Sequence, residues 1–311
     1  MNPRTLIAFL VLLQASPASA SPPVIDDIAL INEFTRDLGE LADGGNIPTA
    51  DDLKKIAAKA PRFESPLELP PAEDAVTSTS YDALSQSVYL VGTVYNCGKC
   101  NQWHRSGSAT AWCLGSDGLM VTNAHVFLNA QGAAMGVSDR DGRCFPVTEV
   151  LAIDSAADIA VFRVRAEGLQ ALPVGPTAEV GDDITIISHP SGNYFMRTSG
   201  SVARYLRRPS SKNAGQKVVW MSVTADYAKG SSGGPVFNSK GQVVGMVATT
   251  NSIYTGPKTT KKSKNAKAAP TNPKGDLQMV MKHCVPIDSI RNLFRNQTVA
   301  TPDDLELEAG L

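Results

Sequence analysis

Short apolar runs separated by turn-forming residues recur along the chain from about residue 81 onward. Each run has the length of a strand, is rich in Val, Ile, Met or Phe, and is bounded by Gly, Asn, Asp or Ser, which is the pattern of a buried β-strand. The clearest predicted strands cover residues 119–122, 159–164, 218–223, 236–238, 242–248 and 277–285. The pattern therefore predicts a region built mainly of strands.

Residues 21–80 follow a different pattern. Apolar residues recur there with a helical period, at Ile28, Ile31, Phe34, Leu38 and Leu41. Two glycines at 44–45 end this helix, and Thr49 with the two acids after it opens a second helix over residues 53–60. Prolines at 61, 66, 70 and 71 then predict an extended linker. We interpret the segment as a helical hairpin with a Pro-rich linker, which is either a solvated connection or a lid, pro-segment or partner-binding element.

The C-terminal part is predicted to contain a lysine-rich loop, a closing helix and a polar tail. Residues 253–275 hold six lysines and no acid. This loop is either a solvated insertion or an electrostatic collar for anionic substrates or cell-envelope polymers. Residues 286–294 are predicted to form a helix, because Pro286 suits its first turn. Residues 298–311 form an acidic tail.

Residues 1–20 have the pattern of a secretory signal peptide. Arg4 precedes an apolar run over residues 6–13, and Ala18-Ser19-Ala20 forms an Ala-x-Ala cleavage site. The run is too short to span a membrane as a helix. We therefore expect an exported chain, periplasmic or secreted, with no membrane span after cleavage.

The composition is that of a folded globular protein and excludes one class of partner. Hydrophobic residues make up 42% of the chain and charged residues 19%. The formal net charge of −1 gives no overall positive field, so we expect no nucleic-acid partner.

A loop of small residues stands between two of the predicted strands. Residues 229–236 read Lys-Gly-Ser-Ser-Gly-Gly-Pro-Val. Glycines let a backbone approach a substrate carbonyl and turn successive N–H groups toward one point, as a nucleophilic serine at Ser232 would require. The same residues also suit a plain hairpin turn.

Two further stretches favour the nucleophilic interpretation. His125 lies in a small-residue turn after the strand at 119–122, and Asp158 stands directly before the strand at 159–164. Either residue alone has an ordinary structural explanation, as a core or surface histidine and as a turn or capping aspartate. The order His, Asp, Ser is one of those known for the acyl-transfer triad. We therefore predict Ser232 as nucleophile, His125 as general base and Asp158 as the group that orients the imidazole.

These stretches resemble the motifs of trypsin-like serine proteases, and most of all those of the bacterial HtrA-type branch. The similar segments are residues 122–126, 158–164, 179–192, 199–202 and 230–238. The resemblance covers residues 88–294. It implies an all-β fold of two six-stranded antiparallel β-barrels, with the active site in the cleft between them. We expect the protease domain to occupy residues 81–297, which leaves no room for a PDZ domain.

The resemblance also assigns residues that would bind substrate. The backbone N–H groups of Gly230 and Ser232 would form an oxyanion hole. The strand at Val247, Ala248 and Thr249 would pair with the backbone of a protein or peptide substrate. Asp226, six residues before the nucleophile, would lie at the floor of the primary pocket. A buried carboxylate there would favour Arg or Lys in the substrate, and the competing expectation is a small aliphatic side chain.

The five cysteines, an odd number, include a pair that the resemblance does not explain. Cys113 lies on the strand before the histidine turn and Cys144 lies in the next hairpin, so the two are expected to form a disulfide. Cys97 and Cys100, with His104 nearby, fit three alternatives. They form a disulfide with each other or with Cys284, a zinc site completed by His283 or Cys284, or a thioredoxin-like redox site.

The sequence as a whole predicts an exported serine endopeptidase that needs no cofactor or metal for its chemistry. Two alternatives stay open. One is a non-catalytic binding or scaffold module on a protease fold. The other is a metal- or redox-dependent module centred on Cys97 and Cys100.

Overall fold

The computed structural model describes residues 24–61, 63, 69, 78–210, 215–255 and 275–295. The predicted signal peptide, most of the Pro-rich linker, most of the lysine-rich loop and the acidic tail lie outside the described residues. Within them, no helix is both long and apolar enough to cross a membrane.

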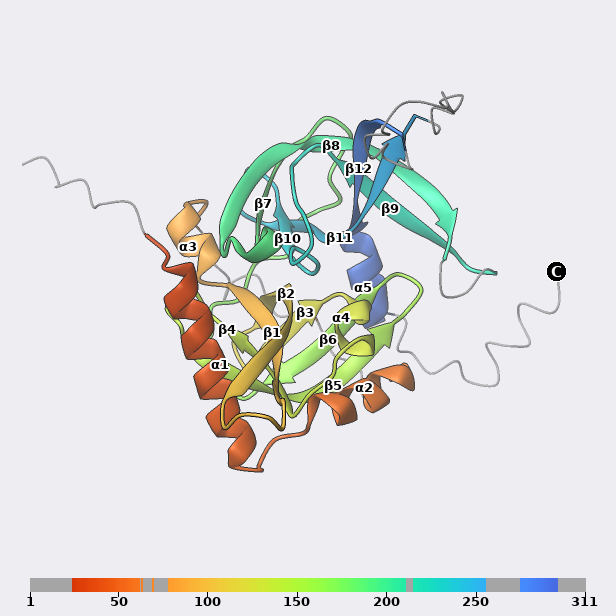
Figure 1. Cartoon of the computed structure of the whole chain (residues 1–311). Helices are drawn as coiled ribbons and strands as arrows, with labels where there is room; N and C mark the ends of the chain where they lie inside the picture. Colours follow the sequence, from red (N-terminus) through yellow and green to blue (C-terminus); the bar gives the residue numbers. More distant parts are fainter. Residues whose placement is uncertain are drawn as a thin grey trace, which may run out of the picture.

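The described part of the chain folds into two closed six-stranded antiparallel barrels, one above the other in Figure 1. The first barrel has the strand order β1-β2-β3-β6-β5-β4. Its strands are β1 (Val88–Asn96), β2 (Trp103–Gly115), β3 (Leu119–Thr122), β4 (Ala134–Ser138), β5 (Cys144–Asp154) and β6 (Ile159–Val164). Pairing of β1 with β4 closes it.

The second barrel has the strand order β10-β11-β12-β9-β8-β7. Its strands are β7 (Asp183–Ser188), β8 (Met196–Pro209), β9 (Lys217–Val223), β10 (Pro235–Phe237), β11 (Val243–Tyr254) and β12 (Leu277–Pro286). Pairing of β7 with β10 closes it. The predicted all-β class and the two six-stranded barrels are therefore confirmed.

Among the described residues, five helices accompany the barrels. They are α1 (Asp27–Asp43), α2 (Ala50–Ala58), α3 (Tyr81–Ser85), α4 (Ala124–Leu128) and α5 (Ile287–Arg295), and a single 3₁₀ turn, η2 (Pro190–Gly192), follows β7. Helices α1 and α2 lie along the first barrel, and α5 follows β12 (Figure 1). The helix expected after Pro286 is thus present.

The two N-terminal helices are part of the hydrophobic core. Thr49 caps α2 by accepting a hydrogen bond from the N–H of Asp52, as the sequence indicated. Phe34 and Leu38 of α1 and Leu53 of α2 are fully buried among barrel residues. The interpretation of this segment as a solvated connection is therefore wrong for both helices. The predicted apolar face of α1 needs one correction: Ile28 is 74% exposed, and Leu30 is buried instead.

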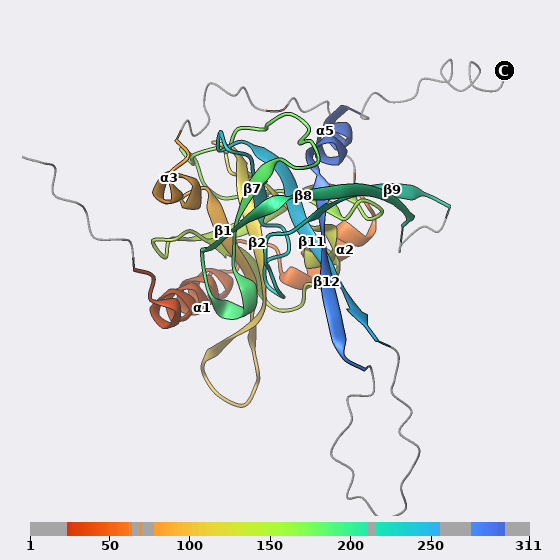
Figure 2. The same cartoon turned by 90° about the horizontal axis from the view of Figure 1, so that it is seen from above.

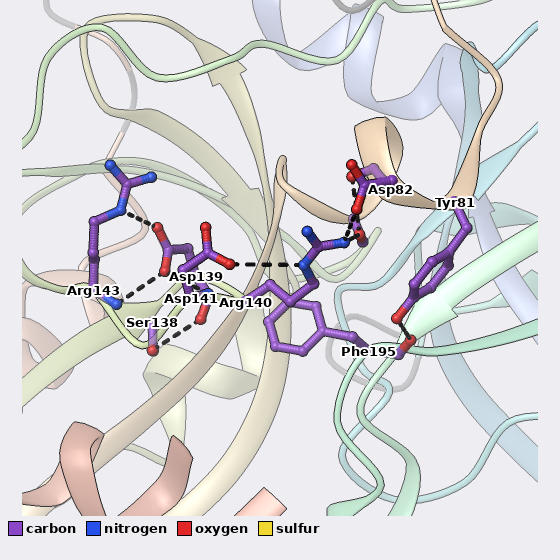
Figure 3. Close-up of polar contacts among 9 residues, drawn as sticks. Tyr81, Asp82, Ser138, Asp139, Arg140, Asp141, Arg143 and Phe195 are labelled. Atoms are coloured by element: carbon purple, nitrogen blue, oxygen red, sulfur yellow. Dashed lines mark hydrogen bonds and ion pairs between the residues drawn. The ribbon is translucent and has the colours of Figure 1, made fainter. Parts of the chain in front are cut away.

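Helix α3 joins the two barrels (Figure 3). Arg140, in the turn after β4, forms an ion pair with Asp82 at 2.8 Å and donates to the Ser85 hydroxyl at 2.9 Å. On the other side of the helix, the Tyr81 hydroxyl donates to the Phe195 carbonyl of the second barrel at 2.8 Å. One short helix thus contacts both halves of the protein.

His189 lies in a segment that contacts residues 229–236, the serine loop, and protonation of its ring would destabilise the fold. Its ring is fully buried beside Phe195, whose N–H donates to Nδ1 at 3.0 Å. Burial lowers the pKa of His189 to about 4, from an ordinary value near 6.5. Below pH 6.5 the His189 ring binds a proton in the unfolded chain but stays neutral in the folded chain until about pH 4. The protein therefore loses stability as the pH falls.

We expect this histidine to remove about 3 kcal/mol from the free energy of unfolding between pH 6.5 and pH 4. Urea denaturation at several pH values checks this, with His189→Asn as the comparison because its side-chain oxygen can still accept from Phe195. The variant should show a shallower dependence on pH than the wild type. Equal slopes for the two proteins would contradict the assignment.

Candidate active site

The turn after β3 presents His125. Asn123 stands before α4, and its side-chain amide donates to the Asp158 carbonyl at 3.0 Å. The His125 ring follows in the first turn of the helix, with its side chain 36% exposed. The end of a buried strand thus fixes the backbone of the histidine, and its ring stays accessible.

Asp158 contacts His125 at two points. The ring Nδ1 lies 2.8 Å from Asp158 Oδ2, and the His125 backbone N–H donates to Asp158 Oδ1 at 2.9 Å. Asp158 adopts a positive φ of 61°, a conformation that costs energy for a residue with a side chain and is less costly for Asp than for most. Both carboxylate oxygens are thus aimed at one histidine.

The serine loop joins the barrels. The Thr110 N–H of β2 donates to the Ser232 carbonyl at 2.8 Å, and the Thr110 hydroxyl donates to the Gly230 carbonyl at 3.0 Å. On the opposite side, the Gly233 N–H donates to the Val247 carbonyl of β11 at 2.9 Å. The loop is therefore held by both halves of the protein.

Two N–H groups in this loop are unused. Among the described residues, neither the Gly230 nor the Ser232 N–H has a hydrogen-bond acceptor. Gly230 has a φ of 101°, and a Cβ at this position would overlap the His189 carbonyl oxygen. Only glycine fits that backbone. The two free donors are available to an anion.

Among the described residues, the Ser232 hydroxyl forms no hydrogen bond with the imidazole. It donates to the Ala248 carbonyl at 3.5 Å, which is a long hydrogen bond. Rotation about the serine χ1 would move the hydroxyl, and hydrogen bonds of this kind are often loose before substrate binds. His125 and Ser232 nevertheless line one common pocket.

Two pockets meet at His125. One, of about 240 Å³, lies between β1, β2 and the serine loop, and His125, Gly230 and Ser232 are in its wall. The other, of about 420 Å³, lies between the loop before β6 and the strands of the second barrel. It is lined by His125, Ser155, Ala156, Asp158, Arg208, Pro209, Trp220, Ala248, Thr249 and His283. A chain crossing from one pocket to the other would pass His125, and Ser232 lines the first of the two pockets.

Asp226 is not a buried pocket acid. Its side chain is 85% exposed and forms an ion pair with Lys282 of β12 at 2.6 Å. The premise that a buried carboxylate would select Arg or Lys is therefore wrong. The adjacent Tyr227 points inward instead, and its hydroxyl donates to the carbonyls of Thr249 and His283.

The expected substrate strand is only partly free. Val247 uses both of its backbone groups, because its N–H donates to Gly234 and its carbonyl accepts from Gly233. Ala248 and Thr249 lie beyond this contact and line the larger pocket. Any pairing with a substrate backbone is thus confined to these two residues and those after them.

All five cysteines lie within the described residues, and all are free thiols. Cys113 packs in one hydrophobic cluster, and its thiol donates to the Gly115 carbonyl, whereas Cys144 packs against another. The structure therefore lacks the expected disulfide between them. Burial raises the pKa of each of these two thiols to about 12.

The other three cysteines are divided between the barrels. Cys97 and Cys100 lie between β1 and β2 of the first barrel, whereas Cys284 is buried in β12 of the second (Figure 2). The alternatives that joined Cys284 or His283 to this pair are therefore wrong. His104, in contrast, lies beside Cys100. The backbone N–H of Lys99 and the thiol of Cys100 lower the pKa of Cys97 to about 7.

Sequence patterns did not indicate two residues of the larger pocket, Arg208 and Trp220, whereas its third such residue, His283, was considered as a zinc ligand. His283 is buried, its Nδ1 lies 2.9 Å from the Ser222 hydroxyl, and its Nε2 has no hydrogen-bond partner among the described residues. Burial, with help from Arg208 and Arg204, lowers the pKa of His283. Their strands give no motif, and only the pairing of β8, β9 and β12 brings them together.

Two closed antiparallel barrels, with a histidine–aspartate pair and a serine loop at their junction, define the trypsin-like fold. The comparison with known families agrees with this geometry. Residues 109–246 match the trypsin-like peptidase domain. This segment, which is less than half of the chain, is therefore similar to a trypsin-like peptidase domain, and the fold is trypsin-like.

The relatives belong to the HtrA/DegP type. Putative serine protease HhoB of Synechocystis is 32% identical over 143 residues, which is 45% of this chain and 34% of the relative. Putative serine protease HhoA of the same organism is 31% identical over 159 residues, covering 49% and 39%. A probable periplasmic serine endoprotease, DegP-like, of Hahella chejuensis is 29% identical over 150 residues, covering 48% and 30%. The matches span only about a third of the length of these relatives.

Proposed function

We propose that this protein is a serine endopeptidase. The observation that carries the proposal is the two-point contact between Asp158 and His125, in a pocket wall that also holds Ser232. Such a contact fixes one tautomer of the imidazole, with the proton on Nδ1 and a basic Nε2 directed away from Asp158.

The proposed reaction is acyl transfer. Ser232 Oγ attacks the substrate carbonyl carbon while His125 takes its proton. The negative charge that develops on the carbonyl oxygen is stabilised by the free N–H groups of Gly230 and Ser232. His125 then gives its proton to the leaving amine. A water molecule next attacks the acyl-enzyme while His125 takes its proton, and His125 returns a proton to Ser232 as the acid product leaves.

A fluorophosphonate probe tests the proposal. It phosphonylates a serine only where a base and an oxyanion site are assembled, so it should label one site per chain, at Ser232. The matched control is Ser231→Ala, which removes the buried neighbouring hydroxyl and should leave labelling intact. Absence of label from folded wild-type protein would instead favour the binding or scaffold module.

The proposal includes export. Residues 1–20 would direct the chain to the periplasm or the outside and be removed there. The name of the DegP-like relative, a probable periplasmic endoprotease, agrees with this. The N-terminal sequence of the processed protein, expected to begin at Ser21, is the direct measurement.

We also propose that the larger pocket prefers an acidic or polar substrate side chain over a basic one. Arg208 and His283 stand in its wall, and Arg208 has no acidic partner among the described residues. Asp158, which also lines the pocket, is engaged with His125. The uncompensated charge at the pocket mouth is thus positive, and a carboxylate would compensate it.

Arg208→Gln is expected to lower kcat/KM about fivefold for peptides with Glu N-terminal to the scissile bond, since an exposed charge pair is worth up to about 1 kcal/mol. Peptides with Gln at that place should be unaffected. The neighbouring Arg207→Gln is the matched control, because successive side chains of a strand point to opposite faces. A similar loss in both variants would show a general charge effect and contradict the subsite.

A further inference from the structure

A cluster of three side chains lies between β1 and β2, outside the proposed active site. Cys97 Sγ and Cys100 Sγ are 3.3 Å apart, and Cys100 Sγ is 3.1 Å from His104 Nε2. The three atoms all lie within 4.8 Å of one another. Thiolates and imidazole nitrogen are the ligands that Zn²⁺ takes most often in proteins.

The backbone of this hairpin holds the two sulfurs together. Gly98 adopts a φ of 68°, and its N–H donates to the Asn96 side-chain oxygen at 2.8 Å. This tight turn thus keeps the two sulfurs close together before any metal binds.

The third side chain is positioned from the facing strand. His104 pairs across the hairpin with Tyr95, whose ring centroid lies 5.5 Å from that of the imidazole. The preceding Trp103 donates its indole N–H to Asp43 of α1 at 3.2 Å. A Cβ on Gly39 of α1 would overlap the Trp103 ring, so indole and helix are in close contact. The start of β2, which carries His104, is therefore held against α1.

A disulfide between Cys97 and Cys100 is the competing use of these thiols. A disulfide needs sulfurs about 2.0 Å apart and has no use for the imidazole. Bonds of about 2.3 Å from zinc to sulfur and about 2.0 Å to nitrogen place tetrahedral ligand atoms about 3.5–3.8 Å apart. The convergence of His104 on Cys100 favours the metal. Binding it requires the two sulfurs to separate by only about half an ångström, and likewise the Cys100 sulfur and the His104 nitrogen.

We propose that Cys97, Cys100 and His104 bind one Zn²⁺ ion. Its fourth position is open to water or another ligand, beside a groove of about 620 Å³ between this hairpin and α1. The ion cross-links the hairpin because its three ligands come from both sides of it. Zn²⁺ is redox-inactive, so the site takes no part in electron transfer. The same strand β2 continues to Ser106 and Ser108 in the wall of the smaller pocket, so the ion braces one side of the cleft.

Metal content of the full-length protein tests the site. After reduction with a phosphine, incubation with zinc and removal of excess metal, elemental analysis should find one zinc per chain. Cobalt in its place should give a thiolate-to-metal charge-transfer band and the strong visible absorption of a tetrahedral ion. Removing a ligand should weaken zinc binding by at least about 100-fold, since loss of outer partners alone costs 10–100-fold.

The variants for this test are Cys97→Ser and His104→Gln, with Cys144→Ser as the control because it removes a thiol outside the cluster. The control should keep one zinc, and both ligand variants should lose it while retaining the wild-type circular dichroism spectrum. If Cys97→Ser does not fold, the zinc content of His104→Gln and the cobalt spectrum of the wild type still test the site. Wild-type protein that takes up no zinc when reduced, or a control that loses zinc equally, would overturn the proposal.

Discussion

Replacing Ser232 by alanine is expected to lower kcat for a peptide substrate by on the order of 10⁶, because the nucleophile of the proposed reaction is removed. A residual rate on the order of 10³–10⁴ above the uncatalysed reaction should remain, since the two free N–H groups and the binding pockets persist. Steady-state hydrolysis of an unfolded protein such as casein measures the loss.

The comparison that gives this result its meaning is Ser231→Ala. Ser231 is adjacent in the same loop, is buried, and accepts a hydrogen bond from the Ser188 hydroxyl at 3.0 Å. Its loss should cost stability more than rate. If Ser232→Ala and wild-type protein cleave casein equally, then Ser232 is not the nucleophile.

Gly230→Ala is expected to reduce kcat by about 10²- to 10³-fold, the effect of losing one oxyanion donor. The added Cβ would overlap the His189 carbonyl, so the Gly230 peptide must turn, which would displace its free N–H. A φ of 101° also costs alanine about 1–3 kcal/mol of stability. Active-site titration with the fluorophosphonate separates a slower site from a smaller folded fraction.

Gly181→Ala is a closely matched control. Its φ is 100°, and a Cβ there meets no atom within 4 Å. Both variants therefore carry the same backbone strain, but only Gly230→Ala carries the overlap. Similar activities of the two variants would mean that strain alone matters and that Gly230 has no special part in the site.

The local parts of the fold follow from the sequence, and the long-range parts do not. Strands and helix ends depend on neighbouring residues, so Thr49 at the start of α2 and the apolar run of β3 could be predicted. The buried face of α1 depends on what covers it. Ile28 fits the helical period but lies beyond the barrel surface, and Leu30 takes its place.

The candidate site divides in the same way. His125, Asp158 and Ser232 each stand next to a strand end in a distinctive local setting, so their types and order indicated them. The prediction for Asp226 was wrong because its distance along the chain from Ser232 does not determine whether the side chain is buried. Its partner Lys282 is placed beside it by the pairing of β12 with β9. Arg208 was missed because strand pairing brings it to His283 across about 75 residues of the chain.

The packing of α1 on the first barrel also has a consequence for biosynthesis. The helix ends at Asp43, and strands β4 and β5, against which it packs, begin at Ala134 and Cys144. At typical translation rates of about 5–20 residues per second, roughly 90 more residues take about 5–20 seconds to synthesise. Throughout that interval Phe34 and Leu38 have no barrel to cover them. The nascent chain therefore exposes the apolar face of this helix, which chaperones can bind, well before its first barrel can close.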